Sequence, residues 1–73
     1  MDTATLEMIT QLLEHYDAHL RDKGEHLADM MADWADASQT ETIKYAQRYS
    51  INRLERQRVN DCLRIIHDAI SNE

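Results

Sequence analysis

The stretch Ala37-Ser38-Gln39-Thr40-Glu41 decides how this chain folds. A serine followed three residues later by a glutamate is the pattern of a capping box, in which each side chain binds a free backbone N–H group at the start of a helix. The stretch therefore predicts that one helix ends near Ala37 and that another begins at about Gln39. It lies at the middle of a chain of 73 residues, so the segments on either side of it are nearly equal in length.

Apolar side chains recur in the first segment in alternating steps of three and four residues, which is the spacing of a helix that packs along one seam. The series keeps its phase across Gly24, with Lys23 as its one polar member. It therefore predicts a continuous helix over about residues 4–36. A break at Asp22-Lys23-Gly24 stays open, because glycine inside a helix costs about 1 kcal/mol. The apolar members are Leu6, Ile9, Leu13, Tyr16, Leu20, Leu27, Met30 and Trp34.

The second segment predicts a helix over about residues 39–71. Helices of roughly 32 residues would each be about 48 Å long, and a short connection forces them to lie antiparallel. The predicted fold is therefore an all-α, antiparallel two-helix hairpin with coiled-coil-like packing, which forms a single domain over residues 1–73. Facing residues are expected to have numbers that sum to 75 or 76. The seam of the second helix then consists of Tyr45, Tyr49, Asn52, Arg56, Val59, Leu63, Ile66 and Ile70.

Polar side chains interrupt both seams at one level of the hairpin. Lys23 is expected opposite Asn52, and Arg56 is expected opposite Leu20 in the next layer. Either the two basic side chains lay their methylene groups on the seam and send their charges to water, or this polar layer fixes the register of the helices. Both alternatives stay open at the level of the sequence.

The composition limits the classes of function. Fourteen acidic residues against eight basic ones give a net charge of −6, which argues against a nucleic-acid binder, because phosphate binding needs an excess of basic side chains. A chain this small, with one glycine and no proline, offers few loops for a catalytic pocket, so we expect no enzyme and no cofactor. No apolar stretch is long enough to predict a membrane span. Cys62 is the single cysteine and cannot form an internal disulfide, which indicates a reducing, cytoplasmic location.

Three residues have a spacing that could hold zinc. His15 and His19 are four apart on one helical face, and Asp22 follows one turn later. The alternative is a pair of solvated histidines on an acidic helix, and we favour it because no residue is placed to orient the ligands. Cys62 and His67 are five apart and point to different sides of a helix. The sequence therefore predicts no metal site.

A second apolar stripe on the second helix lies off the seam and is expected to face away from the first helix. Scattered surface aliphatic residues are common, but an aligned stripe is typical of a surface that binds a partner. Met8, Leu12 and Met31 of the first helix also lie off the seam. We therefore predict a partner-binding surface, without deciding between a second copy and a different protein. Its residues on the second helix are Ile51, Leu54, Arg58, Cys62, Ile65 and Ala69, where Arg58 interrupts the apolar series.

The chain resembles the small needle co-chaperones of bacterial type III secretion, the YscE and SsaE type. The similarity lies in the size and layout of the whole chain, in the start at Thr5-Leu6-Glu7, and in the apolar end over residues 63–70. It implies a helical hairpin that pairs with a larger tetratricopeptide-like chaperone, so that the pair keeps the needle subunit soluble in the cytoplasm before export. The arginine-rich stretch from Arg53 to Arg58 is not part of this similarity.

Two other functions remain open. A homodimeric four-helix bundle of the Rop type would be a regulatory protein, and as an RNA binder it would need the basic side chains of the second helix, namely Lys44, Arg48, Arg53, Arg56 and Arg58. An acidic phage-type inhibitor would use the carboxylates of the first helix, although their spread is that of an ordinary solvated surface. The expected partner is therefore a protein, with a homo-oligomer as the alternative when the chain is alone.

Overall fold

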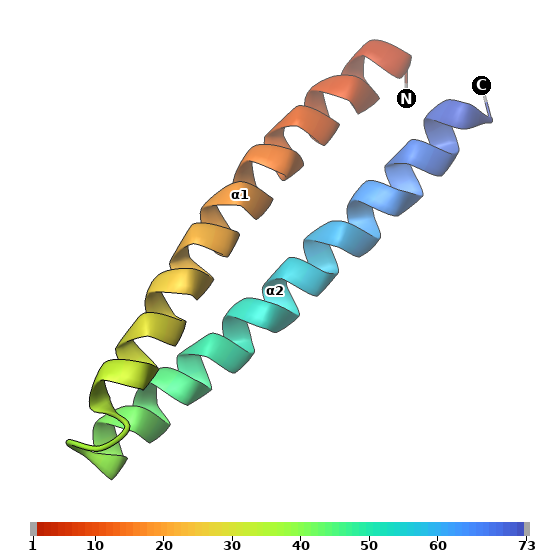
Figure 1. The fold of residues 1–73 in the computed structure, drawn as a ribbon. Helices are drawn as coiled ribbons and strands as arrows, with labels where there is room; N and C mark the ends of the chain where they lie inside the picture. Colours follow the sequence, from red (N-terminus) through yellow and green to blue (C-terminus); the bar gives the residue numbers. More distant parts are fainter. Residues whose placement is uncertain (1, 73) are drawn as a thin grey trace.

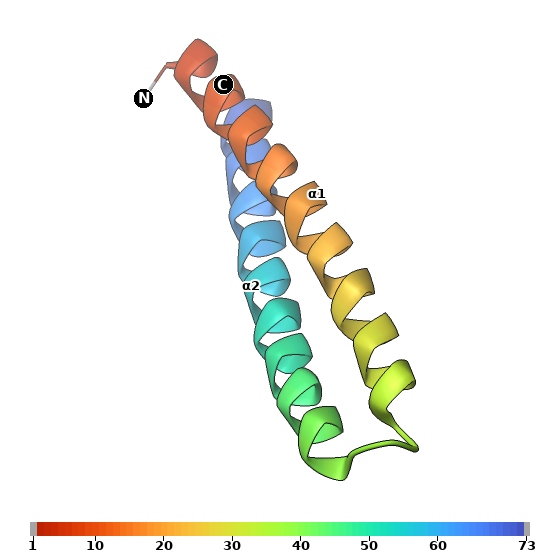
Figure 2. The same ribbon diagram turned by 90° about the vertical axis from the view of Figure 1, so that its left-hand side faces the viewer.

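The computed structural model describes residues 2–72, and over this range the chain forms two helices, α1 (Thr3–Trp34) and α2 (Gln39–Ser71). They run antiparallel and side by side along their whole length, as both views show (Figures 1 and 2). The molecule is a rod of 54 × 14 × 13 Å. The predicted all-α helical hairpin is therefore confirmed, with α2 at its predicted bounds and α1 ending two residues before the predicted position 36.

Side-chain caps define where both helices begin. The Asp2 carboxylate accepts a hydrogen bond of 2.7 Å from the backbone N–H of Thr5, and this bond lowers the pKa of Asp2 below its ordinary value. At α2, the Ser38 hydroxyl accepts a hydrogen bond of 3.3 Å from the N–H of Glu41. Each side chain thus binds one of the N–H groups that a helix start leaves without a partner.

The connection between the helices differs from a full capping box. The backbone N–H of Ser38 donates to the carbonyl oxygen of Trp34 at 2.9 Å, and the N–H of Ala37 donates to the same oxygen at 3.0 Å. The prediction that the Glu41 side chain binds the N–H of Ser38 was therefore wrong, because the last turn of α1 already supplies the acceptor. The turn is closed by backbone bonds on one side and by the Ser38 hydroxyl on the other.

The seam of α2 follows the predicted spacing, because all eight of its predicted members are buried or half-buried. The most buried apolar side chains in the described residues are Leu20, Leu27 and Val59, at 3%, 5% and 8% exposed. They lie in the middle of the rod and towards the connection. The core is thus one narrow line of contacts between two helices, as expected for a hairpin without a third element.

The predicted seam of α1 is confirmed at every seventh residue. In the central turns it is wrong at the positions between these residues. Leu6, Leu13, Leu20, Leu27 and Trp34 are all buried or half-buried. Between these residues, Gly24 is buried whereas Lys23 is exposed, and Asp17 is more buried than Tyr16. Lys23 therefore does not lie opposite Asn52, and Gly24 takes the place that the sequence assigned to it.

Gly24 and Asn52 face one another across the seam and lie very close together. The Asn52 side chain is 4% exposed, and its Nδ2 donates a hydrogen bond of 2.9 Å to the carbonyl oxygen of Leu20. A Cβ atom at position 24 would lie 2.6 Å from Asn52 Oδ1, so a larger residue does not fit without a shift. The numbers 24 and 52 sum to 76, in agreement with the predicted register. Gly24 does not break α1 but makes room for a buried amide.

Arg56 has a role that the sequence did not predict. Its Nε lies 3.3 Å from the Asp17 Oδ1 atom, and both side chains are partly buried on the seam. Arg56 therefore pairs with a carboxylate of α1 instead of sending its charge to open water.

Candidate partner-binding face

The predicted partner-binding residues are all exposed. Met8, Leu12 and Ile65 keep between 63% and 66% of their surface accessible, and Ile51 and Leu54 keep 57%. Arg58, Cys62 and Ala69 are also exposed. Exposure shows that the side chains are free to meet a partner, and the binding role itself stays a prediction.

A hydrogen bond between the helices shows which sides of them meet. The Tyr16 hydroxyl donates to the Glu55 carboxylate at 3.2 Å. On the other side of the seam, His67 Nε2 and Glu14 Oε1 approach to 4.0 Å. Glu14 and Tyr16 are two residues apart, which is about 200° around a helix, so the two contacts mark opposite flanks of the hairpin.

The stripe of α2 lies on the Tyr16–Glu55 flank. At about 100° per residue, its six members fall within about 100° of Glu55 and to one side of it. Met8 and Leu12 precede Tyr16 by eight and four residues and therefore share its side of α1. Leu54 points away from α1, as the sequence predicted for the stripe, while Ile51, Cys62 and Ala69 lie nearer the flank where Tyr16 meets Glu55. We call this surface the Tyr16–Glu55 face: Met8, Leu12, Tyr16, Ile51, Leu54, Glu55, Arg58, Cys62, Ile65 and Ala69.

Tyr16 is a member of this face that sequence reasoning missed. Its apolar ring and its place in the three-and-four series assigned it to the seam, yet it is 45% exposed. The hydrogen bond to Glu55, together with the negative charge of that carboxylate, raises the pKa of Tyr16 above its ordinary value of 10.0. Tyrosine combines an apolar ring with a polar tip, which suits a half-exposed position at the rim of an interface.

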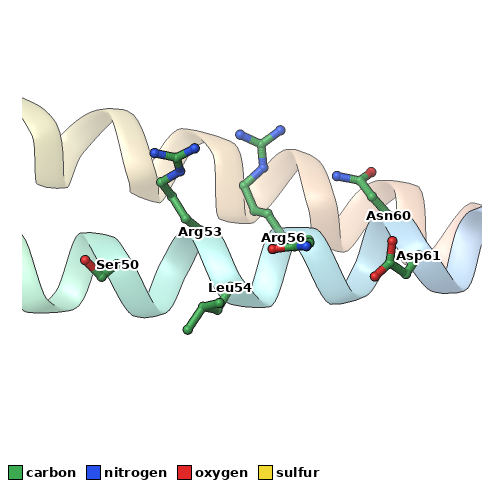
Figure 3. A pocket seen from close by; sticks show the side chains of 7 residues that line it. Ser50, Arg53, Leu54, Arg56, Asn60 and Asp61 are labelled. Atoms are coloured by element: carbon green, nitrogen blue, oxygen red, sulfur yellow. The ribbon is translucent and has the colours of Figure 1, made fainter.

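A shallow groove runs along α2 beside the stripe. Figure 3 shows Arg53 and Arg56 projecting together towards α1, while Leu54 points to the other side of the helix. Because all the lining residues come from one helix, this groove of about 740 Å³ is an open surface. Its residues are Ser50, Arg53, Leu54, Arg56, Gln57, Asn60 and Asp61.

A second hollow lies between the helices at the level of Gly24 and Asn52. It measures about 570 Å³, and Arg21, Arg53 and Arg56 line it together with Glu25. Arg56 already pairs with Asp17, and Glu25 offsets one of the other two charges. We therefore assign no ligand to this hollow.

The residues considered for zinc are His15, His19 and Asp22, which all lie exposed on α1. Among residues 2–72, no three His, Cys, Asp or Glu side chains come together in an arrangement that could hold a metal ion. Within the same range, no helix has the length and apolar character needed to cross a membrane. We found no match to this chain among protein-family models, curated proteins or solved structures.

Proposed function

We propose that this chain is a non-enzymatic protein-binding module that associates through the Tyr16–Glu55 face. In the finer form of the proposal it is a cytoplasmic co-chaperone. It pairs with a larger helical-repeat chaperone to keep a type III secretion needle subunit soluble before export. The protein-binding role is supported by the surface described above, and the secretion role by the resemblance in size, layout and terminal segments.

The main support is the amount of surface that the hairpin leaves open. A compact protein of 8.6 kDa is expected to expose about 4,700 Å². The chain exposes 5563 Å², which is almost a fifth more. The difference is close to the roughly 800 Å² that each partner buries in a typical protein–protein interface.

The distribution of apolar side chains also supports the proposal. Five large ones on this face are more than half exposed, whereas the core has three that are well buried. Burying one such side chain contributes about 1.5–3 kcal/mol, so two or three of them can anchor a complex. A partner that covers the face would supply the burial that a two-helix hairpin lacks.

The test is an affinity purification of the chain from its native host, with the bound proteins identified by mass spectrometry. Ile51→Asp and Leu54→Asp should lose the partner, because each places a charge inside the apolar surface. Asn60→Asp is the matched control, since Asn60 is also exposed on α2 but lies about 140° around the helix from Glu55, on the side away from the stripe. Circular dichroism should show that all three variants keep their helices.

The outcomes separate the candidate functions. Recovery of a tetratricopeptide-type chaperone or a needle subunit with the wild type and Asn60→Asp, but not with Ile51→Asp, supports the co-chaperone. Recovery of nucleic acid favours the Rop-type regulator. If the stripe variants retain every partner at full strength, the binding surface lies elsewhere and the proposal fails.

A further inference from the structure

Arg58 is a charged residue in the centre of an apolar stripe. It is exposed, and within residues 2–72 no hydrogen bond or ion pair reaches it. Three other arginines of α2 have partners: Arg56 pairs with Asp17, Arg64 pairs with Asp61, and Arg48 lies 5.5 Å from the ring centre of Tyr45. Arg53 has none among residues 2–72 either, but it lies outside the stripe. Any partner that covers the stripe must therefore accommodate the Arg58 guanidinium.

A second copy of the chain would place Arg58 against itself. Ile51 and Ile65 lie seven residues before and after Arg58, and Leu54 and Cys62 lie four before and after it. An antiparallel pair that matches Ile51 with Ile65 and Leu54 with Cys62 therefore has its two-fold axis at Arg58. A parallel two-fold pair also sets each residue against its own copy. Both arrangements bury two guanidinium groups side by side among apolar side chains, which is costly without an opposite charge.

Shifting the register by three residues does not favour a second copy either. Pairing Arg58 with Glu55 of a second copy would bring Ile65 against Arg48 and Ala69 against Lys44 of that copy. The shift thus replaces apolar contacts with charged ones, and Glu55 already accepts the hydrogen bond from Tyr16. Two chains that each carry a net charge of −6 also repel one another at long range.

Building on the protein-binding function above, we propose that the Tyr16–Glu55 face binds a helix of a different protein, with a carboxylate opposite Arg58. That helix carries apolar residues at spacings of three and four, which match the stripe. An arginine forms two parallel hydrogen bonds with a carboxylate, so the pair satisfies the charge while the apolar side chains close around it. Arg58 selects this partner and excludes a second copy, because specificity needs a group that penalises the wrong pairing.

The chain itself supplies the probe. In Arg58→Glu a carboxylate stands on an otherwise identical stripe, so this variant presents to the wild type the chemistry that we assign to the partner. Light scattering after size exclusion should find the 8.6 kDa monomer for each protein alone. An equimolar mixture of the wild type and Arg58→Glu should give twice that mass. The affinity between the two proteins should be at least about tenfold higher than the affinity of either protein for itself.

Two further variants sharpen the test. Arg58→Leu removes the repulsion and should self-associate at least about tenfold more tightly than the wild type, and adding Ile51→Asp should abolish this. Arg53→Glu makes the same change of charge two residues from Glu55, on the other side of α2. A mixture of Arg53→Glu with the wild type should stay monomeric. Circular dichroism checks that every variant is folded.

Two results would overturn the proposal. In the first, the wild type forms a dimer that Arg58→Leu does not tighten. In the second, the mixture of wild type and Arg58→Glu associates no more tightly than the mixture with Arg53→Glu. Because these measurements need only variants of this chain, they stand apart from the host purification. A failure to recover any host protein would count against the proposed function and leave this result in place.

Discussion

Asn52 is a polar side chain in the most buried layer of the hairpin, and its burial is tolerated because it is satisfied locally. Nδ2 donates to the Leu20 carbonyl oxygen, and Gly24 leaves the space that the amide occupies. An unpaired amide at this place would cost about 1–3 kcal/mol. The amide therefore favours the register in which residue 52 stands against residue 24, as buried polar residues do in coiled coils.

Gly24→Ala should destabilise the hairpin by about 1 kcal/mol. Alanine gains about 1 kcal/mol of helix propensity, but its Cβ displaces Asn52 and breaks a buried hydrogen bond, which outweighs the gain. In an Asn52→Ala background the same change should stabilise, because the space is then open. Urea denaturation followed by circular dichroism measures both effects, with Lys23→Ala as an exposed control. A Gly24→Ala variant more stable than the wild type would show that the close approach carries no cost.

Tyr16 should titrate above the ordinary tyrosine pKa of 10.0, because its hydroxyl donates a hydrogen bond to the Glu55 carboxylate. A raised pKa means that the bond stabilises the fold below pH 10.0 and that this contribution is lost as the pH rises through the folded-state value. NMR titration of the labelled tyrosine rings measures it. Glu55→Gln should bring the pKa of Tyr16 back towards 10.0. An unchanged pKa of Tyr16 in this variant would contradict the assignment.

At the scale of the elements, the helix ends depend on short-range hydrogen bonds that the sequence encodes directly. Asp2 caps α1 and Ser38 caps α2. Two threonines, Thr10 and Thr42, donate their hydroxyl hydrogen atoms to carbonyl oxygens four residues earlier. Such contacts need no partner from the other helix, so the bounds of the helices were predictable to within two residues.

Ser38→Ala should lower the free energy of unfolding by about 1 kcal/mol, the usual cost of losing a helix N-cap. Glu41→Ala should cost only a few tenths of a kcal/mol, because the N–H of Ser38 already donates to Trp34. Thr40→Ala, at an exposed position of the same turn, is the control. Chemical denaturation compares the three variants. If Glu41→Ala costs as much as Ser38→Ala, the full capping box forms after all.

At the scale of the whole molecule, the rod has a thin core and a large apolar surface. Its interior is the seam between α1 and α2, and most of its large exposed apolar side chains lie on the Tyr16–Glu55 face. Adjacent residues can therefore have opposite roles. Leu13 is half-buried on the seam, whereas Leu12 is 66% exposed on that face.

Leu13→Asp should unfold the hairpin, because it places a charge in the one interface that holds the helices together. Leu12→Asp should keep the helix content of the wild type, since a charge at an exposed site is solvated. Circular dichroism distinguishes the two at once. Equal loss of helix in both variants would mean that the Tyr16–Glu55 face contributes to folding of the isolated chain.

The sequence by itself determined the hairpin, the helix bounds, the seam of α2 and the exposure of the stripe. These features follow from local caps and from apolar spacing, which are properties of each helix alone. The tertiary structure decided whether Lys23 or Gly24 lies on the seam of α1 between Leu20 and Leu27. A helical period of 3.6 residues leaves position 23 and position 24 equally placed, and only the partner helix distinguishes between them. Gly24 lies on the seam, where it leaves room for the Asn52 amide. In the same arrangement Tyr16 lies against Glu55 and Asp17 against Arg56.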